Sequence, residues 1–256
     1  MSEALVRHLH AFVREVEPTM EEWWEGIDFL TRTGHMCSAT RQEFVLLSDT
    51  LGVSMLVDAI NHRDDGATES TVLGPFYVED PPRAELGADI SGGQTGERLL
   101  VEGTVRAVDG APIAHATVDA WHSDTEGYYD IQHDGETHMR ARFTTDDEGR
   151  FRFWSIVPSS YPIPTDGPIG EMLDAQGRHP YRPAHVHFLI SAPGFRRLVT
   201  HLFVAGDEYL SSDAVFAVKE SLICELERLP AGTATDGTIV SEPYARLAYD
   251  FVLVAG

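Results

Sequence analysis

Apolar residues recur at helical spacing through the first quarter of the chain, in three stripes. Pro18 separates the first two stripes, and Thr40-Arg-Gln-Glu43, which is typical of a capping box, precedes the third. The stripes comprise Leu5, Leu9, Phe12, Val13 and Val16; Trp23, Trp24, Ile27 and Leu30; and Phe44, Leu47, Leu51, Met55 and Ile60. The pattern predicts helices whose apolar positions mostly serve core packing, but such a segment also needs a surface to pack against.

Short strand-like runs separated by turn signals replace this pattern from about residue 99. Linker-like segments, 63–66 and 91–96, lie between the two patterns. Strands are expected at 100–108, 142–145, 150–154 and 198–204, with a closing strand at 244–254 and one helix near 213–229. Strands without intervening helices favour a β-sandwich. The predicted class is therefore α+β, with a helical segment and linker over residues 1–98 and a mainly antiparallel β-sandwich over residues 99–256.

Charge and composition limit the function. The 256 residues are 43% hydrophobic, which is enough for a large core, and 41 acidic against 19 basic residues give a formal net charge of -22. This charge opposes binding to nucleic acid and to anionic membranes. The first residues lack a basic region followed by a long apolar core, and no apolar run approaches membrane-spanning length. A cytoplasmic enzyme is the expectation.

Two histidines, His185 and His187, lie two residues apart in an apolar run that resembles a strand. Because successive side chains on a strand face opposite sides, both imidazoles share one face, while Val186 and Phe188 take the other. Two imidazoles at this spacing can bind one metal ion, or they can be polar residues of a half-exposed strand. The only cysteines, Cys37 and Cys224, form no zinc-binding pattern or disulfide framework.

Two tyrosines in glycine- or proline-rich segments, Tyr129 and Tyr161, could supply further ligands. Each could also simply pack its ring and expose its hydroxyl. A phenol binds metal well only as the phenolate, which requires a hard and strongly Lewis-acidic cation. Ferric iron fits this requirement better than zinc or copper.

The chain resembles the intradiol ring-cleavage dioxygenases, a non-haem Fe(III) family that opens catechols between their two hydroxyls. The resemblance covers about residues 70–210 and rests on motifs that occur in the family's order. They are Leu73-Gly-Pro-Phe76-Tyr77, Val101-Glu-Gly-Thr-Val105, Ala116-Thr-Val-Asp-Ala-Trp121-His122, Gly127-Tyr-Tyr129, Gly177-Arg-His-Pro-Tyr-Arg182-Pro-Ala-His185-Val-His187 and Gly206-Asp-Glu-Tyr-Leu210.

This resemblance implies one Fe(III) per chain, held by Tyr129, Tyr161, His185 and His187. It also implies that Tyr161 leaves the metal and takes a proton from the substrate, while a bound hydroxide takes the other. Arg182 is then the electrostatic partner of negative charge that develops on the ring. Taken by itself, Arg182 could instead form a surface salt bridge.

Within the family, Thr68–Phe76 and Tyr161–Pro164 are most similar to the hydroxyquinol 1,2-dioxygenase branch. His201 stands where the catechol branch has glutamine, which argues against catechol as the preferred substrate. Asp49 could accept a hydrogen bond from a third hydroxyl, or it could simply meet solvent. The substrate wall implied by the resemblance comprises Leu46, Asp49, Val72, Leu73, Gly74, Pro75, Phe76, Ile163, Pro164, Arg182, His201 and Val215.

The resemblance further implies a homodimer formed by the N-terminal helices, with a phospholipid at that interface as a further candidate ligand. The expected partners are O2 and a small aromatic diol or triol, and the expected product is a muconate. Three alternatives stay open. They are a catechol or chlorocatechol 1,2-dioxygenase, an Fe(II) extradiol or cupin oxygenase, which requires two histidines and a carboxylate, and a non-enzymatic prealbumin-like binding module.

Overall fold

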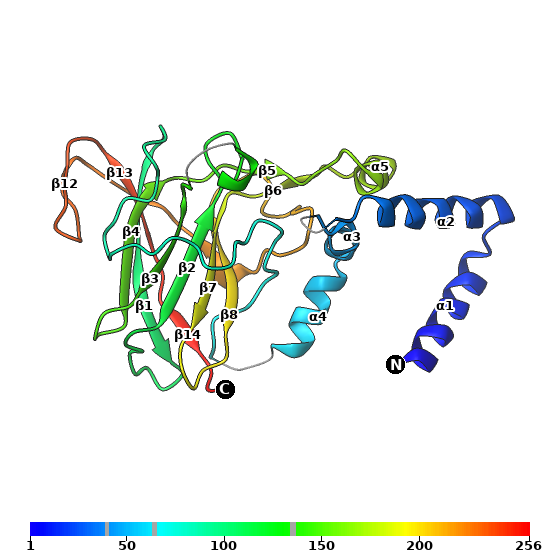
Figure 1. Cartoon of the computed structure of the whole chain (residues 1–256), viewed down its shortest axis with the longest axis horizontal. Coiled ribbons are helices and arrows are strands. Elements are labelled where there is room, and N and C mark those ends of the chain that lie inside the picture. Colours follow the sequence, from blue (N-terminus) through cyan, green and yellow to red (C-terminus); the bar gives the residue numbers. More distant parts are fainter. Residues whose placement is uncertain (39–40, 63–65, 134–136) are drawn as a thin grey trace.

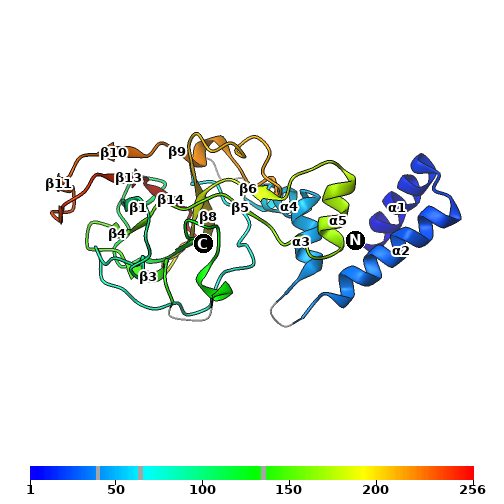
Figure 2. The same cartoon turned by 90° about the horizontal axis from the view of Figure 1, so that it is seen from above.

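Helices lie at one end of the molecule and two β-sheets at the other in the computed structural model (Figures 1 and 2). It describes residues 1–38, 41–62, 66–133 and 137–256. In both views α3, α4 and α5 lie between the sheets and the outlying pair α1 and α2. The helices are α1 (Ser2–Val16), α2 (Met20–His35), α3 (Glu43–Thr50), α4 (Val53–Asn61) and α5 (Pro168–Ala175), with 3-10 turns η1 (Asp130–Gln132) and η2 (Glu220–Leu222).

The helical stripes form helices as predicted, with local signals that set their ends. The expectation that their apolar positions mostly serve core packing is wrong, because most of them are exposed and Met55 is the stripe residue that is buried. Thr19 caps α2: its hydroxyl accepts from the Glu22 N–H at 3.2 Å, and the Glu22 carboxylate accepts from the Thr19 N–H at 2.7 Å. Gly52, at φ 72°, divides the third stripe into α3 and α4. The predicted cap at Thr40 and part of the predicted linker, residues 63–65, lie outside the described residues. Among those described, no helix is both long and apolar enough to cross a membrane.

The β-domain contains two five-stranded sheets. In the first sheet, β13, β14 and β4 each pair with β1, and β10 pairs with β13. The second sheet has the order β3-β2-β7-β8-β9. Two-stranded pairs, β5-β6 and β11-β12, accompany them. The strands are β1 (Arg98–Ala107), β2 (Thr117–His122), β3 (Arg140–Thr144), β4 (Arg150–Ile156), β5 (Tyr161–Pro162), β6 (Tyr181–Arg182), β7 (His185–Ser191), β8 (Leu198–Val204), β9 (Ile223–Cys224), β10 (Glu227–Leu229), β11 (Gly232–Thr233), β12 (Ile239–Val240), β13 (Tyr244–Ala248) and β14 (Phe251–Leu253).

The predicted class is confirmed: most strand pairings are antiparallel, as expected, but both large sheets also contain parallel pairs and are therefore mixed. β1 pairs in parallel with both β13 and β14, and β8 pairs in parallel with β9. The predicted closing strand is two strands, because the chain bulges at Tyr249 and Asp250, where the Asp250 carboxylate accepts the Thr104 N–H at 2.8 Å. Gly103 permits this bulge, since a Cβ there would lie 1.8 Å from the Tyr249 carbonyl oxygen.

The predicted helix near residues 213–229 is wrong. The segment begins with a turn closed by the Asp213 carboxylate, continues into η2, and ends in β9 and β10. Phe216 within the turn has φ 57°, which a helix does not accommodate. The hydrogen bonds of Asp213 thus fold this segment into a turn, although its apolar spacing is helical.

Strand β7 separates the sandwich core from the outer face of its sheet. Val186, Phe188 and Ile190 belong to the buried apolar cluster between the sheets. His185 and His187 alternate with them and face the other side, as predicted, where loops bury both imidazoles to 1% exposure. The fold therefore places two imidazoles in a dry layer outside the main core.

A buried histidine connects the two sheets. His122 lies at the end of β2, and its Nε2 is 2.7 Å from the Ser155 hydroxyl on β4. Its Nδ1 donates to the Ser123 carbonyl oxygen at 2.7 Å. Burial lowers the pKa of His122 from 6.5 to about 4, so the ring is neutral at physiological pH.

We expect His122 to make the fold sensitive to acid. Its folded pKa is depressed, so its contribution to stability is present above the unfolded pKa of 6.5 and is lost as pH falls toward about 4. The loss amounts to about 3 kcal/mol in the free energy of unfolding. Urea unfolding of the wild type and of His122→Gln should show this difference in pH dependence. The exposed control His10→Gln should follow the wild type, and a wild-type curve parallel to that of His122→Gln would contradict the assignment.

Candidate metal centre and substrate pocket

Four side-chain donor atoms converge on the outer face of β7. The Tyr129 hydroxyl is 2.9 Å from His187 Nε2 and 3.2 Å from the Tyr161 hydroxyl, and His185 Nε2 is 3.0 Å from His187 Nε2. All four residues are buried. Tyr129 precedes η1, Tyr161 begins β5, and the two histidines come from β7, so three separate elements build the cluster.

The hydrogen bond of His185 to Pro183 leaves Nε2 as the unprotonated nitrogen that faces the cluster. His185 Nδ1 lies 2.6 Å from the Pro183 carbonyl oxygen, which can only accept, so Nδ1 carries the proton. Nε2 is then unprotonated and faces His187. Burial lowers the pKa of both imidazoles well below the ordinary value, which keeps them neutral. Neutral imidazole with one nitrogen fixed by a carbonyl is the form that binds metal.

The spacing of the four donors suits a single cation. Bonds of roughly 2.0–2.1 Å meeting near right angles place neighbouring donors roughly 2.9 Å apart. Three of the donor separations are 2.9, 3.0 and 3.2 Å, within a few tenths of an ångström of this value. Burial raises the pKa of Tyr129 well above 10.0, so only a strongly Lewis-acidic cation would ionise it. Two phenols and two imidazoles fit ferric iron better than zinc.

Aromatic rings hold two members of this set in place. The Trp121 ring on β2 stacks on His187 with centroids 4.7 Å apart, and Phe76 stacks on Tyr129 at 4.4 Å. Gly74 has φ 78°, and a Cβ there would lie 3.0 Å from His187 Cε1. Sequence reasoning gave Trp121 no role, although it lies within a motif of the resemblance.

Arg182 extends the cluster and is buried, so a surface salt bridge is excluded. Its Nη1 is 3.5 Å from the Tyr161 hydroxyl and 3.3 Å from His185 Nε2. Its Nε donates to Asp213 at 3.1 Å. Burial would lower the pKa of Arg182, but Asp213 and the tyrosines raise it overall, so the guanidinium stays charged. Asp213 could not be recognised from the sequence, because the apolar spacing of its segment predicts a helix.

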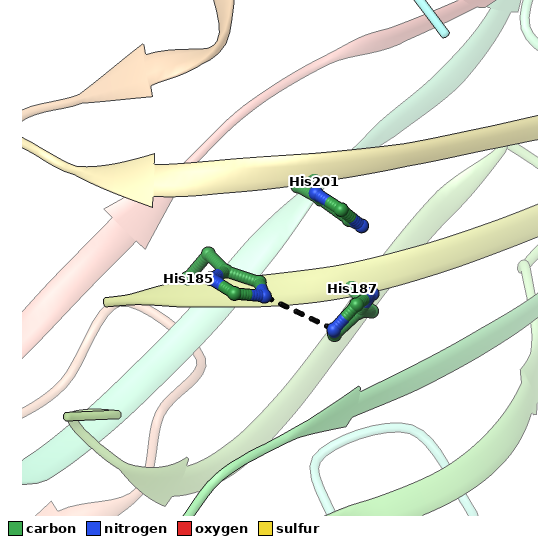
Figure 3. Close-up of side chains that lie close together, drawn as sticks. All are labelled: His185, His187 and His201. Carbon is green, nitrogen blue, oxygen red and sulfur yellow. Dashed lines mark hydrogen bonds between the residues drawn. The ribbon is translucent and has the colours of Figure 1, made fainter. Parts of the chain in front are cut away.

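A third imidazole, His201, comes from the neighbouring strand β8 directly opposite His187 (Figure 3). The ligating atoms of His185, His187 and His201 lie within 4.8 Å of one another, so they form a second arrangement that could hold a metal. His201 Nδ1 is also 3.4 Å from Arg182 Nη2. Within the described ranges this is the sole group of three histidine, cysteine or carboxylate residues at metal-binding distance. The group contains no carboxylate, whereas an extradiol or cupin oxygenase site would require one.

Asp49 near the end of α3 is a buried carboxylate without a full set of partners. It is 6% exposed, and no described residue donates a hydrogen bond to its Oδ1. Burial raises its pKa, Ser54 and Arg182 act to lower it, and Asp213 acts to raise it. A buried, unpaired acceptor is costly unless a ligand satisfies it. The alternative that Asp49 merely meets solvent is excluded.

The remaining members of the expected substrate wall differ in their placement. Val215 and Ile163 are buried in the same apolar cluster as the sandwich core, and Leu46 and Val72 pack against it. Leu73 and Pro75 are exposed, whereas Gly74 and Pro164 are partly buried. The structure therefore packs four of the expected wall residues in or against the apolar core, whereas Leu73 and Pro75 are exposed.

Comparison with known proteins identifies the family. A model described as "Dioxygenase" matches residues 72–255, and one described as "Catechol dioxygenase N terminus" matches residues 1–69. The chain belongs to the intradiol ring-cleavage dioxygenases, as its motifs predicted, and is an oxidoreductase. Iron is the metal of this family. The prealbumin-like alternative without enzymatic activity is therefore wrong.

Two relatives and one solved structure are similar to this chain over nearly its whole length. The chain is 52% identical to hydroxyquinol 1,2-dioxygenase of Nocardioides simplex over 98% of its length and 87% of that protein. It is 52% identical to 6-chlorohydroxyquinol 1,2-dioxygenase of Cupriavidus pinatubonensis, with 98% and 88% covered. The structure of hydroxyquinol 1,2-dioxygenase from Pseudomonas putida superposes with a TM-score of 0.93 at 51% identity, covering 99% of this chain and 90% of that one.

Proposed function

We propose that this chain is an Fe(III)-dependent hydroxyquinol 1,2-dioxygenase. It inserts both atoms of O2 into benzene-1,2,4-triol and forms 3-hydroxy-cis,cis-muconate, the enol form of maleylacetate. The observation that carries the proposal is the buried Asp49 carboxylate, whose Oδ1 lacks a donor among the described residues and which interacts electrostatically with Arg182. The relatives named for hydroxyquinol support it.

Tyr129, Tyr161, His185 and His187 would hold one ferric ion per chain. When bound, this ion supplies the Lewis acidity that binds the ionised substrate oxygens and withdraws electron density from the ring. The three-histidine arrangement with His201 is less suitable, because it replaces hard phenolate ligands by a third imidazole.

The surrounding residues bind substrate and handle its protons. Tyr161, which would hold the ion as its phenolate, would accept one substrate proton at its oxygen and become the neutral phenol, and a hydroxide would take the other proton. Arg182 Nη1 lies 3.5 Å from that oxygen. The Arg182 guanidinium stabilises negative charge on the ring, because it is a permanent charge in a site with little water. Phe76 and Trp121 pack against Tyr129 and His187 and exclude water there.

Asp49 would select the triol. Its Oδ1 can accept a hydrogen bond from the third hydroxyl of hydroxyquinol, and it would stay unsatisfied with catechol. Leu46, Val72 and Val215 supply an apolar wall that fits the ring.

Turnover by the iron-loaded wild type tests the proposed function. Oxygen uptake and product analysis with hydroxyquinol, catechol and 4-chlorocatechol should show one O2 consumed per ring cleaved, with the highest kcat/KM for hydroxyquinol. A higher kcat/KM for catechol would refute the proposed substrate, and cleavage outside the two adjacent hydroxyls would refute the reaction.

The N-terminal helices would form a homodimer. No residue of α1 is buried, and its apolar stripe is exposed, with Leu9 at 52% and Phe12 at 58%. On α2, Trp24 is 60% exposed. A contiguous apolar surface of this kind is typical of a contact between subunits, and a phospholipid could cover the part that the partner leaves open.

We expect the protein to be a dimer in solution at micromolar concentration. The double variant Leu9→Glu, Phe12→Glu places two charges in the apolar stripe and should give monomers, because burying those charges would cost several kcal/mol. Light scattering with size-exclusion chromatography measures the mass. Arg7→Glu, on the polar side of α1, is the control and should stay dimeric. A monomeric wild type would contradict the proposal, and lipid extraction with mass spectrometry tests the bound phospholipid.

A further inference from the structure

A short turn, residues 213–217, contacts Arg182 and is also linked to α3, the helix that carries Asp49. Both oxygens of the buried Asp213 carboxylate accept from Arg182: Oδ1 from Nε at 3.1 Å and Oδ2 from Nη2 at 3.4 Å. The same oxygens accept backbone N–H groups of the turn, Oδ1 from Val215 at 3.3 Å and Oδ2 from Ala217 at 3.0 Å. One side chain therefore orients the guanidinium and shapes the turn that carries Val215.

The same turn is fastened to the helix that carries Asp49. Arg178 donates from Nη1 to the Thr50 carbonyl oxygen on α3 at 2.7 Å, and from Nη2 to the Ala214 carbonyl oxygen in the turn at 3.0 Å. Its guanidinium also lies over the Phe216 ring, 4.8 Å from the centroid. A planar fork with several donors suits such a bridge, whereas an ammonium does not.

We infer that the turn 213–217 holds the two polar groups of the pocket at a fixed separation, with Asp213 as the positioning residue for Arg182 and Arg178 as the positioning residue for α3 and hence Asp49. This inference rests on the proposed function. Arg182 acts on charge that every diol substrate develops, so Asp213 affects all substrates alike. Asp49 acts on the third hydroxyl alone, so Arg178 affects the choice between substrates.

Substitutions of Asp213 and Arg178 are expected to change different kinetic quantities, which distinguishes both effects from a general loss of structure. In Asp213→Asn, one carboxylate oxygen becomes an amide nitrogen, which faces N–H donors whichever way the amide is turned. Arg182 then loses a charged hydrogen bond. In Arg178→Lys the positive charge stays, but one ammonium does not bridge two carbonyl oxygens and stack on Phe216 in the same geometry. Lysine should therefore fail to restore what alanine removes.

The Asp213 arm uses iron-loaded Asp213→Asn protein. We expect kcat/KM to fall on the order of 10- to 100-fold for hydroxyquinol and catechol alike, because hydrogen bonds to charged groups are of that strength. Anaerobic titration with hydroxyquinol should show weaker binding, while iron content and the visible band of the substrate-free protein stay unchanged. Unchanged kinetics and binding, or activity lost in proportion to iron, would overturn this role.

The Arg178 arm measures the ratio of kcat/KM for hydroxyquinol to that for catechol. We expect Arg178→Ala and Arg178→Lys both to lower this ratio by about tenfold, with activity on catechol within about threefold of wild type. Arg228→Ala, which removes an exposed ion pair with Glu97, is the control and should leave the ratio unchanged. An unchanged ratio in Arg178→Ala, or its full restoration by lysine, would refute the bridge.

The outcome for the wild type separates this inference from the proposed function. If the wild type cleaves catechol in preference to hydroxyquinol, hydroxyquinol is wrong as the proposed substrate. The Asp213→Asn experiment, carried out with catechol, then still tests the role of the turn. If the wild type prefers hydroxyquinol and neither variant has its expected effect, the positioning inference fails by itself.

Discussion

The His185→Ala protein is expected to contain no bound iron and to have no measurable dioxygenase turnover. The substitution removes an unprotonated Nε2 that lies 3.0 Å from His187 Nε2 and belongs to the four-atom donor set. The fold should persist, because His185 faces away from the apolar cluster that contains Val186 and Phe188. Iron analysis, the visible spectrum and the melting temperature measure the three effects. Full iron content in this variant would refute the ligand assignment.

Two further variants decide which donor set holds the metal. Tyrosinate bound to Fe(III) absorbs visible light, so Tyr129→Phe should weaken or shift the colour. His201→Gln should keep both iron and colour, because His201 Nδ1 already contacts Arg182. If His201→Gln lost iron as completely as His185→Ala, the three-histidine set would be correct instead. His179→Ala, outside β7 and with its Nε2 at 2.8 Å from the Ser212 hydroxyl, is the matched control for loss of an imidazole.

Replacing Asp49 by alanine is expected to remove most of the preference for hydroxyquinol over catechol. In the wild type, a hydrogen bond from the third hydroxyl to this carboxylate contributes on the order of 1.5–3 kcal/mol, or about a tenfold to hundredfold difference in kcat/KM. Asp49→Ala should lower that ratio more than it lowers activity on catechol. Asp49→Asn should give an intermediate ratio, because an amide oxygen still accepts but carries no charge.

Val45→Ala is the control for this experiment, since Val45 lies on the same helix α3 and its side chain is exposed. It should leave the substrate ratio at the wild-type value. A preference for hydroxyquinol that survives in Asp49→Ala would assign selection to the apolar wall of Leu46, Val72 and Val215. A wild-type preference for catechol would reject the carboxylate role as well.

Much of the fold could be predicted because apolar spacing reports which face of an element is buried. The predicted strand 198–204 has the observed bounds of β8, and the alternation through His185 and His187 gave the correct faces of β7. Strand direction could not be obtained in this way, because parallel and antiparallel strands share the same alternation. The parallel pairing of β1 with β13 is therefore visible only in the structure.

Only some residues of the candidate site could be predicted from the sequence. Spacing supported the pair His185 and His187. Tyr129 and Tyr161 were candidates from their segments, and their assignment as ligands came from the resemblance to the family. Asp213 was missed because the spacing after it is helical, whereas its carboxylate binds Arg182 and two backbone N–H groups. Arg178 was missed because its two carbonyl acceptors belong to segments far apart in the sequence. Tertiary contacts of this kind leave no periodic signal.

The pairing of β1 with β13 and β14 has a consequence for synthesis of the chain. Residues 98–107 leave the ribosome early, but their parallel partners lie at 244–253 and emerge much later. Closing so long a loop is slow, and an unpaired strand edge favours aggregation while it waits. By contrast, β2, β3, β7 and β8 lie within residues 117–204 and can pair first, and β7 and β8 carry His185, His187 and His201. The sheet of the candidate metal centre can thus assemble before the sandwich closes behind it.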